Sequence, residues 1–395
     1  MPATAPPRAL AVAIVRARYN PFGGAERFVQ RALAALSSRG VELTVIARRW
    51  SAAPEGEPAL RLSFVQVDPF YIGSLWRDWS FARGVHRALR GRHFAIVQSH
   101  ERIAGLPVYR AGDGVHAEYL AQRARALPAW RRAQLAVDPY HRYLRAAERR
   151  MFRHPALRAV ICNSEMVRDE IRERFGVDEA RLHLVRNGVD LQRFRPPSRE
   201  QRAAARDRFA LAPGAPVFAF VGSGFERKGL AGAIHALAQL DAKRDALLLV
   251  AGADRRAPRY ARLAERLGVG PRVRLLGGVD DVRPVLWAAD AFVLPTLYDP
   301  FPNAALEALA CGLPTITSTK SGAAEVVRDG VNGFVRDALD YAGLAAAMAR
   351  LVGADAAQRD AMAAAARESV AGLSLDAMGA ALIALYERLL ESARP

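Results

Sequence analysis

Cysteine, lysine and long apolar runs are all scarce in this chain of 395 residues. Its two cysteines, Cys162 and Cys311, lie far apart and lack the spacing of a metal site, so we expect no bound metal. With so few cysteines, we expect the protein to work in the reducing cytoplasm. No apolar run approaches the roughly 18 residues needed to cross a bilayer. The run at residues 9–15 is shorter and is soon followed by charges, which predicts a first β-strand and no secretion signal.

Positive charge is concentrated in the first half of the chain. Residues 1–196 contain 33 arginines, no lysine and 18 acidic residues, for a net charge of +15. The remainder has 24 basic and 22 acidic residues, for a net charge of +2. A high-GC genome would explain arginine in place of lysine, but not the difference between the halves. We therefore expect the first half to meet an anionic partner: nucleic acid, anionic lipid or a phosphorylated glycan.

The first half alternates between strand-like and helix-like segments, which is typical of a mostly parallel sheet covered by helices. Strands are expected at residues 10–15, 41–47, 61–67, 95–99, 108–111 and 159–163. Helices are expected at residues 24–38, 81–90 and 165–175, and the arginine-rich residues 119–153 are also helical in composition.

A second α/β series follows a break rich in Pro and Gly at residues 196–216. Its strands are expected at residues 217–221, 247–251, 273–276, 291–294 and 315–317. Helices are expected at about 228–240, 257–268, 281–289, 303–311 and 322–329, and the chain from 338 onward reads as almost all helix. The sequence thus predicts an α/β fold of two doubly wound domains, residues 1–196 and 197–375, with a cleft between them.

Two carboxylates, Asp299 and Glu307, stand eight positions apart in the most informative stretch, residues 294–314. The strand expected at residues 291–294 leads into them, and Glu307 falls on the first turns of the next helix. Ligands of α/β proteins bind at the carboxyl ends of strands, against a helix N-terminus. An acid there can accept hydrogen bonds from sugar hydroxyls, while free backbone N–H groups bind an anion or more hydroxyls.

A glycine-rich turn, Val-Gly-Ser-Gly-Phe-Glu-Arg-Lys-Gly at residues 221–229, follows a strand and opens a helix. Gly222 and Gly224 allow a tight turn, and Arg227 and Lys228 follow at the helix start. Lys228 is one of only three lysines in the chain. The spacing is not that of a P-loop, but it suits a diphosphate site that uses no metal.

Further candidates follow strands of the first half and should face the same cleft. Gly23 and Gly24 lie between the first strand and the first helix, where the alternative is an ordinary turn. His100 and His116 end their strands and could bind a sugar hydroxyl or a leaving phosphate, although a lone histidine is often structural. The neighbouring cleft candidates, which could contact the acceptor, are Glu101 and Asp113.

Residues 123–158 combine ten arginines with only two acidic residues and several aromatic side chains. Such a surface suits the headgroup region of an anionic membrane. It would also suit single-stranded nucleic acid, or be a solvated helix face. The density of arginine favours an anionic partner, and we expect the inner-membrane surface rather than nucleic acid.

Together these stretches resemble the retaining glycosyltransferases of family 4, over nearly the whole chain. The shared features are the Gly-Gly turn at 23–24, the Arg-Asn-Gly-Val-Asp run at 186–190, the Arg227–Lys228 pair, and a Glu-x7-Glu signature that here reads Asp299 and Glu307. Within the family, residues 111–118 and 222–229 look most like the lipopolysaccharide core α-glucosyltransferases of Gram-negative bacteria. The resemblance implies the GT-B fold: two facing Rossmann-like domains, with a final helix, about 376–390, that crosses back to the N-terminal domain.

The resemblance also implies roles for single residues. Arg227 and Lys228 would bind the donor diphosphate and stabilise the leaving group. Glu307 would hold the ribose, Asp299 the donor sugar, and His116 would line that sugar from the opposite wall. The catalytic set would be Arg227, Lys228, Asp299 and His116, and the donor-binding set Gly23, Gly24, Gly222, Phe301, Pro302, Asn303 and Glu307.

The implied reaction moves a hexose from a nucleotide sugar, UDP-glucose or similar, to a glycan acceptor such as the lipopolysaccharide core at the inner membrane. Front-face attack, in which the departing phosphate helps deprotonate the acceptor, needs no protein nucleophile, metal or cofactor. The family usually has Glu where this chain has Asp299. The Asp side chain reaches about 1.5 Å less far, so the identity of the donor sugar stays open. We expect a cytoplasmic monomer, peripherally bound to the inner membrane.

Three rival interpretations remain at this point. A nucleotide-sugar 2-epimerase has the same two domains, but it needs no polyanionic or lipid acceptor, so the basic half argues against it. A nucleic-acid-binding protein is suggested by charge alone and does not account for Asp299 and Glu307. A different acceptor, such as another lipid-linked glycan or a phosphoinositol lipid, stays open.

Overall fold

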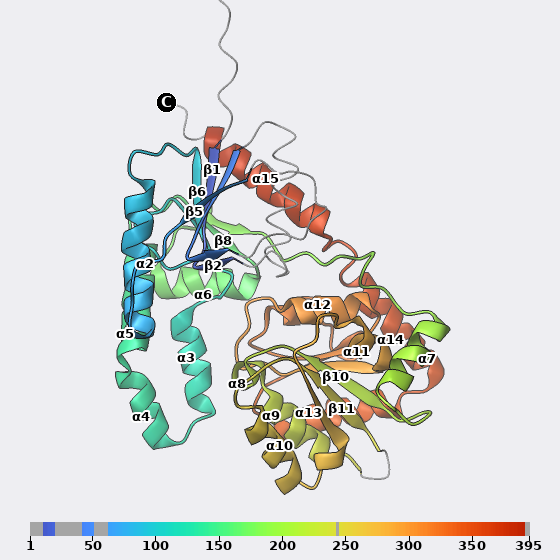
Figure 1. Ribbon diagram of the computed structural model, residues 1–395. Coiled ribbons are helices and arrows are strands. Elements are labelled where there is room, and N and C mark those ends of the chain that lie inside the picture. The colour runs from blue at the N-terminus through green and yellow to red at the C-terminus, as the bar shows by residue number, and fades with distance from the viewer. Residues whose placement is uncertain (1–10, 20–41, 51–61, 242–244, 392–395) are drawn as a thin grey trace, which may run out of the picture.

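Two α/β lobes make up the part of the protein that the computed structural model describes, residues 11–19, 42–50, 62–241 and 245–391. Figure 1 shows a parallel sheet in each lobe, and the last helix of the chain lying against the first lobe. The strands are short, and most are apolar and buried on both faces, which suits parallel sheets covered by helices; the edge strands β5 and β12 are partly exposed. The predicted architecture of two doubly wound units is confirmed.

The sheet of the first lobe has seven parallel strands in the order β5-β3-β1-β6-β7-β8-β9. They are β1 (Ala11–Val15), β3 (Glu42–Ala47), β5 (Leu62–Gln66), β6 (Ile96–Ser99), β7 (Val108–Arg110), β8 (Ala159–Cys162) and β9 (Leu182–Leu184). A separate pair joins β2 (Arg18–Tyr19) to β4 (Arg49–Trp50). The described helices are α2 (Gly73–Leu89), α3 (His116–Arg125), α4 (Ala129–Val137), α5 (Pro139–Phe152), α6 (Glu165–Phe175) and the short η1 (Glu179–Arg181).

The second sheet has six parallel strands in the order β12-β11-β10-β13-β14-β15. They are β10 (Val217–Val221), β11 (Leu247–Ala251), β12 (Val273–Gly277), β13 (Ala291–Leu294), β14 (Thr315–Ser318) and β15 (Gly333–Arg336). Its helices are α7 (Arg199–Arg208), α8 (Phe225–Lys228), α9 (Leu230–Ala238), α10 (Ala257–Arg266), η3 (Gly270–Arg272), α11 (Arg283–Ala288), α12 (Asn303–Ala310), η4 (Gly322–Glu325), α13 (Tyr341–Gly353) and α14 (Ala356–Glu368). Among all the described residues, no helix is both long and apolar enough to cross a membrane.

The final helix α15 (Leu375–Glu391) returns to the first lobe, as the sequence predicted. Leu382, Leu385 and Tyr386 are buried in one cluster with residues of β1, β3, β6 and β8. The Tyr386 hydroxyl also donates a hydrogen bond of 2.7 Å to Gln98 Oε1 at the end of β6. The first sheet therefore completes its core with residues from the far end of the chain.

Several elements differ from the sequence prediction. The short strands β9 and β15 were not anticipated, because three or four residues carry too little periodic signal. Helix α2 begins at Gly73 rather than 81, and the helix predicted at 322–329 is only the single turn η4. Residues 119–153 form three helices, since prolines interrupt them: Pro128 precedes α4 and Pro139 opens α5. The helix predicted at 24–38 lies outside the described residues.

The burial of α15 gives a prediction about stability. Leu385→Ala should lower the free energy of unfolding by about 2–5 kcal/mol, because it leaves a cavity between α15 and the first sheet. Arg388→Ala, on the exposed side of the same helix, should change it by less than about 0.5 kcal/mol. Urea unfolding followed by circular dichroism measures both; equal effects would mean that α15 does not hold the first lobe together.

Candidate active site

A cavity of about 740 Å³ lies between the two lobes, at the carboxyl ends of both sheets. This is where loops gather in α/β proteins, because every parallel strand ends at the same edge. The second lobe contributes Gly222, Ser223, Arg227, Lys228, Asp299 and residues 301–304. The first lobe contributes His100, Glu101, Asp113 and a series of arginine, tyrosine and aspartate side chains. Ten of the predicted site residues thus line one cavity.

The glycine-rich turn leads from β10 into the short helix α8. Gly222 (φ +153°) and Gly224 (φ +75°) adopt backbone angles that other residues rarely take. A Cβ on Gly222 would lie 3.3 Å from the side chain of Lys228, so the glycine leaves room for the lysine stem. Gly229 ends the turn where a Cβ would clash with the carbonyl oxygen of Pro295. The turn therefore carries Arg227 and Lys228 back to the end of the strand.

Asp299 binds both of these cations. Its Oδ2 atom lies 2.5 Å from Lys228 Nζ and 3.2 Å from Arg227 Nη1, and the carboxylate is almost fully buried. Burial opposes ionisation, but the charges of Lys228 and then Arg227 outweigh it and lower the pKa of Asp299. Asp299 therefore carries a negative charge at neutral pH and balances part of the charge of the two cations.

The loop after Asp299 is held from the first lobe by Asn187. Its amide nitrogen donates to the Phe301 carbonyl oxygen and to Asn303 Oδ1, both at 2.9 Å. Arg110 in turn donates to Asn187 Oδ1 at 3.0 Å. These contacts fix the start of α12 against the other lobe. The Arg-Asn-Gly-Val-Asp run was noticed in the sequence, but its bridging role could not be inferred from sequence spacing.

Glu307 lies on α12, four residues after Asn303 and so on the same helix face. Asn303 and Ala304 line the cavity, whereas Glu307 lies one turn further along and does not. Pro302 lines the cavity as the residue before the helix. The helix N-terminus therefore borders the cavity, and Glu307 stands behind it.

His100 and Glu101 follow β6 on the opposite wall. The His100 ring nitrogens lie 3.3 Å from Arg16 Nη1 and 3.0 Å from Gln98 Nε2, so protein groups already engage both. Burial, together with nearby arginines, lowers the pKa of His100 well below its usual value. Glu101 accepts a hydrogen bond from the Ala17 amide at 2.9 Å, and burial raises its pKa.

His116 does not line the cavity. It is the first residue of α3, and its Nε2 atom lies 3.1 Å from Nδ1 of His141 on α5. Burial, followed by the charges of Arg102, His141 and Arg145, lowers its pKa to about 3, so the ring is neutral at physiological pH. Asp113, three residues earlier, is exposed and does line the cavity. Of the two predicted site residues in this segment, Asp113 therefore lines the cavity and His116 does not.

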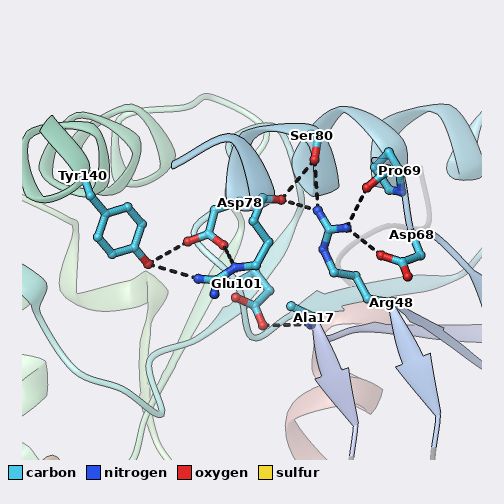
Figure 2. Close-up of polar contacts among 9 residues, drawn as sticks. Ala17, Arg48, Asp68, Pro69, Asp78, Ser80, Glu101 and Tyr140 are labelled. Atoms are coloured by element: carbon cyan, nitrogen blue, oxygen red, sulfur yellow. Dashed lines mark hydrogen bonds and ion pairs between the residues drawn. The ribbon is translucent and has the colours of Figure 1, made fainter. Parts of the chain in front are cut away.

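The rest of the first-lobe wall is a polar network, shown in Figure 2. Arg48, at the end of β3, is buried and donates to Asp68 Oδ1 at 2.8 Å and to Ser80 Oγ at 3.0 Å. Asp78 on α2 accepts from Tyr140 on α5 at 2.8 Å and from Arg77 at 2.7 Å. The members of this network are scattered between residues 48 and 140 and share no motif, so the sequence alone does not reveal it.

Tyr298 joins the lobes beside Asp299. Its hydroxyl accepts from the Val115 amide at 2.8 Å and donates to Glu170 Oε2 at 2.7 Å. Gly114 allows this approach, because a Cβ there would lie only 2.4 Å from the hydroxyl oxygen. Lys320 adds an ion pair of 3.0 Å to Glu170. The segment that carries Asp299 is thus anchored to the first lobe on one side and to the cations on the other.

Two further predictions from the sequence are that Gly23 and Gly24 bind the donor and that the protein holds no metal. Gly23 and Gly24 lie outside the described residues. Within the residues that are described, no cluster of three or more His, Cys, Asp or Glu side chains could hold a metal ion. The positive charge that faces the cavity comes from arginine and lysine side chains.

Comparisons with known proteins agree with this geometry. Two family models match, Glycosyltransferase Family 4 over residues 22–193 and Glycosyl transferases group 1 over residues 215–354. The chain is 30% identical to the D-inositol 3-phosphate glycosyltransferase of Mycobacterium marinum, over 93% of this chain and 81% of the relative. It is 26% identical to the lipopolysaccharide glucosyltransferase WaaG of Escherichia coli K12, over 82% of this chain and 84% of the relative.

Solved structures resemble the whole molecule. A crystal structure of WaaG, a glycosyltransferase involved in lipopolysaccharide biosynthesis, matches with a TM-score of 0.79 and 25% identity, over 94% of this chain and 99% of that one. Anabaena Alr3699/HepE in complex with UDP-glucose matches in fold, with a TM-score of 0.72 and 18% identity over 97% and 100% of the two chains. Two facing parallel sheets around one cleft thus define a glycosyltransferase of the GT-B fold. The chain belongs to the family 4 glycosyltransferases.

The ion pairs of Asp299 predict a pH-dependent stability. Asp299→Asn should lower the free energy of unfolding by about 1–3 kcal/mol near pH 7, because it leaves two cations without their carboxylate. Since the folded pKa is lowered, the stabilisation is present above the unfolded pKa of about 3.9 and is lost as the pH falls through the folded value. The difference from wild type should therefore shrink below about pH 4.

Chemical unfolding at a series of pH values measures this difference, with Asp280→Asn, an exposed substitution in the same lobe, as the control. A difference between wild type and Asp299→Asn that stays constant down to pH 3 would contradict the ion pairs as its origin.

Proposed function

We propose that this protein is a retaining hexosyltransferase that uses a nucleotide sugar, UDP-glucose or a closely similar donor. The observation that carries the proposal is the placement of Lys228 and Arg227 on Asp299 at the edge of the cavity. A donor diphosphate would compete for these cations, and Asp299 would then be available to accept a sugar hydroxyl. The shared fold of Alr3699/HepE with UDP-glucose supports the choice of donor.

The roles of the second-lobe residues follow from charge and position. Lys228 and Arg227 would hold the diphosphate and stabilise the negative charge that grows as the bond to the sugar breaks. Because two side-chain cations already supply this charge, we propose a reaction without a metal or another cofactor. Glu307, behind Asn303 on α12, would hold the ribose. Leaving-group phosphate would take the proton of the attacking acceptor hydroxyl, so no protein nucleophile is required.

The acceptor would bind to the first lobe. Residues 1–196, with the returning α15, would form the acceptor domain, and residues 197–375 the donor domain. We propose the lipopolysaccharide core as the acceptor, supported by the likeness to WaaG in sequence and fold. The second candidate is a phosphorylated inositol, favoured by the 30% identity with a D-inositol 3-phosphate glycosyltransferase. His116, behind the wall, would position α3 rather than touch the donor sugar.

We further propose that the protein works at the cytoplasmic face of the inner membrane, peripherally bound. Five arginines of the segment 142–153 are exposed, and no described acidic residue pairs with them: Arg142, Arg145, Arg149, Arg150 and Arg153. Arg123 and Arg125, earlier in the basic residues 123–158, instead pair with Glu226 and Asp337 of the second lobe. The membrane-facing part of residues 123–158 would therefore include α5.

Transfer assays test the donor site. Lys228→Ala and Glu307→Ala should each lower the rate of transfer at least about 100-fold, the loss typical of a removed electrostatic contact. Arg262→Ala, exposed on α10 away from the cavity, is the matched control and should transfer normally. A panel of nucleotide sugars, screened by thermal stabilisation, identifies the donor beforehand.

Near-normal transfer by either site variant would refute the assignment of the donor site. Conversion of the donor to its 2-epimer without any acceptor would favour the epimerase instead.

Vesicle binding tests the basic surface. Replacing the five exposed arginines of α5 and its C-cap by glutamine should weaken binding to anionic vesicles at least about tenfold, since each basic residue near such a surface contributes about 1 kcal/mol. Hydrolysis of the donor should remain unchanged, because none of these side chains lines the cavity. Sedimentation with vesicles at two salt concentrations measures the effect; unchanged binding would reduce α5 to a solvated helix.

A further inference from the structure

The segment before α2 presents two different faces. Tyr71 lines the cavity, and the Arg48 guanidinium lies 4.8 Å from the centre of its ring. Its neighbours on both sides point the other way, with Phe70 73% exposed and Ile72 69% exposed. One short segment therefore forms part of the acceptor wall with one side chain and places two large apolar side chains in solvent.

The apolar surface continues along the first turns of α2. Leu75, Trp76 and Trp79 are exposed, and the Phe70 ring packs edge-on against Trp76 with 5.8 Å between centroids. Five large apolar side chains within ten positions are thus exposed in the part of the chain that the structure describes, from 38% for Leu75 to 73% for Phe70. Single exposed apolar residues are normal, but a contiguous group marks an interaction surface.

Basic residues continue the same stripe of α2. Arg83, His86, Arg87 and Arg90 are exposed and follow Trp76 and Trp79 at helical spacing. The Arg83 guanidinium lies 5.0 Å from the Trp79 ring centre. Asp78, the one acidic residue of α2, faces inward and bonds to Arg77 and Tyr140 (Figure 2). The outer face of α2 is therefore aromatic at one end, basic at the other, and free of acidic charge.

We propose that residues 70–79 insert into the interfacial region of an anionic bilayer, and that this membrane delivers the acceptor to the cavity. Aromatic and apolar side chains beside a basic stripe suit the headgroup boundary, whereas a basic face alone would only adsorb to its surface. Helix α5 lies beside this segment, because Tyr140 binds Asp78, so its exposed arginines add attraction on the same side. The bilayer partner is favoured over a protein by this charge pattern.

The position of the insertion site has a consequence for the acceptor. Tyr71, Arg77 and Asp78 belong to the inserting segment and line the cavity. A glycan attached to a lipid in the same bilayer would emerge next to this wall and would not have to leave the membrane. This part of the inference rests on the proposed function, since it takes the cavity to be a transferase site; membrane insertion itself does not.

The test uses the full chain and vesicles of phosphatidylcholine with or without anionic phosphatidylglycerol. Phe70→Ser/Ile72→Ser should weaken binding to the anionic vesicles at least about tenfold, because it removes two inserted apolar side chains. Val331→Ser, an exposed apolar residue of the second lobe, is the matched control and should bind like wild type. Circular dichroism confirms that each variant is folded.

A second measurement locates the inserted residues. Brominated acyl chains should quench the tryptophan fluorescence of wild type, and Trp76→Phe/Trp79→Phe should lose most of this quenching while it still binds. Quenching that persists in this variant would place the insertion elsewhere, such as at Trp130 on α4, and would overturn the proposal. Equal binding of Phe70→Ser/Ile72→Ser and wild type would also overturn it.

Thermal stabilisation by UDP-glucose, measured on the same proteins, separates this inference from the proposed function. Wild type and both double variants should be stabilised equally, because none of the altered residues lines the cavity. If UDP-glucose and the other nucleotide sugars stabilise none of the proteins while vesicle binding still depends on Phe70 and Ile72, the insertion stands and the transferase site fails. If a nucleotide sugar stabilises the proteins but vesicle binding does not depend on Phe70 and Ile72, the insertion is refuted and the transferase site stands.

Discussion

Two neighbouring side chains, Tyr298 and Asp299, connect the contact between the lobes to the charges of the cavity. The Tyr298 hydroxyl is fixed by the Val115 amide and Glu170 of the first lobe, while the Asp299 carboxylate binds Lys228 and Arg227 of the second. A change in the spacing of the lobes would therefore displace the Asp299 carboxylate relative to Lys228 and Arg227. The site depends on this loop, because Tyr298 contacts the opposite lobe while the adjacent Asp299 contacts the glycine-rich turn.

The arginines that give the first half its large positive charge lie in three different environments in the folded molecule. Arg123, Arg125 and Arg186 pair with acidic residues of the second lobe. Others, such as Arg48 and Arg77, are held by carboxylates inside the cavity wall. The exposed arginines of α5 and α2 face outward, and no acidic residue that the structure describes pairs with them. Net charge alone would have overestimated the surface available to an anionic partner.

Part of the first-lobe wall of the cavity and the exposed apolar surface belong to one stretch of chain, from Asp68 to Trp79. Alternation along the segment before α2 turns Tyr71 inward and Phe70 and Ile72 outward. The network of Arg48, Asp78 and Tyr140 gives that stretch a fixed position. Binding of a glycan and contact with its lipid surroundings would then be properties of a single structural element.

The sequence by itself determined the α/β architecture, the strands β10 to β14 of the second lobe and the grouping of Lys228, Asp299 and Asn303, because these follow from apolar periodicity and from short local motifs. It could not place His116, which opens α3 and turns toward His141 behind the wall. It also did not show the bridging role of Asn187 and Tyr298 or the Arg48 network, whose partners lie 18 to 183 positions away. Only the tertiary structure decided those contacts, since side-chain direction and long-range pairing depend on how segments far apart in the chain pack together.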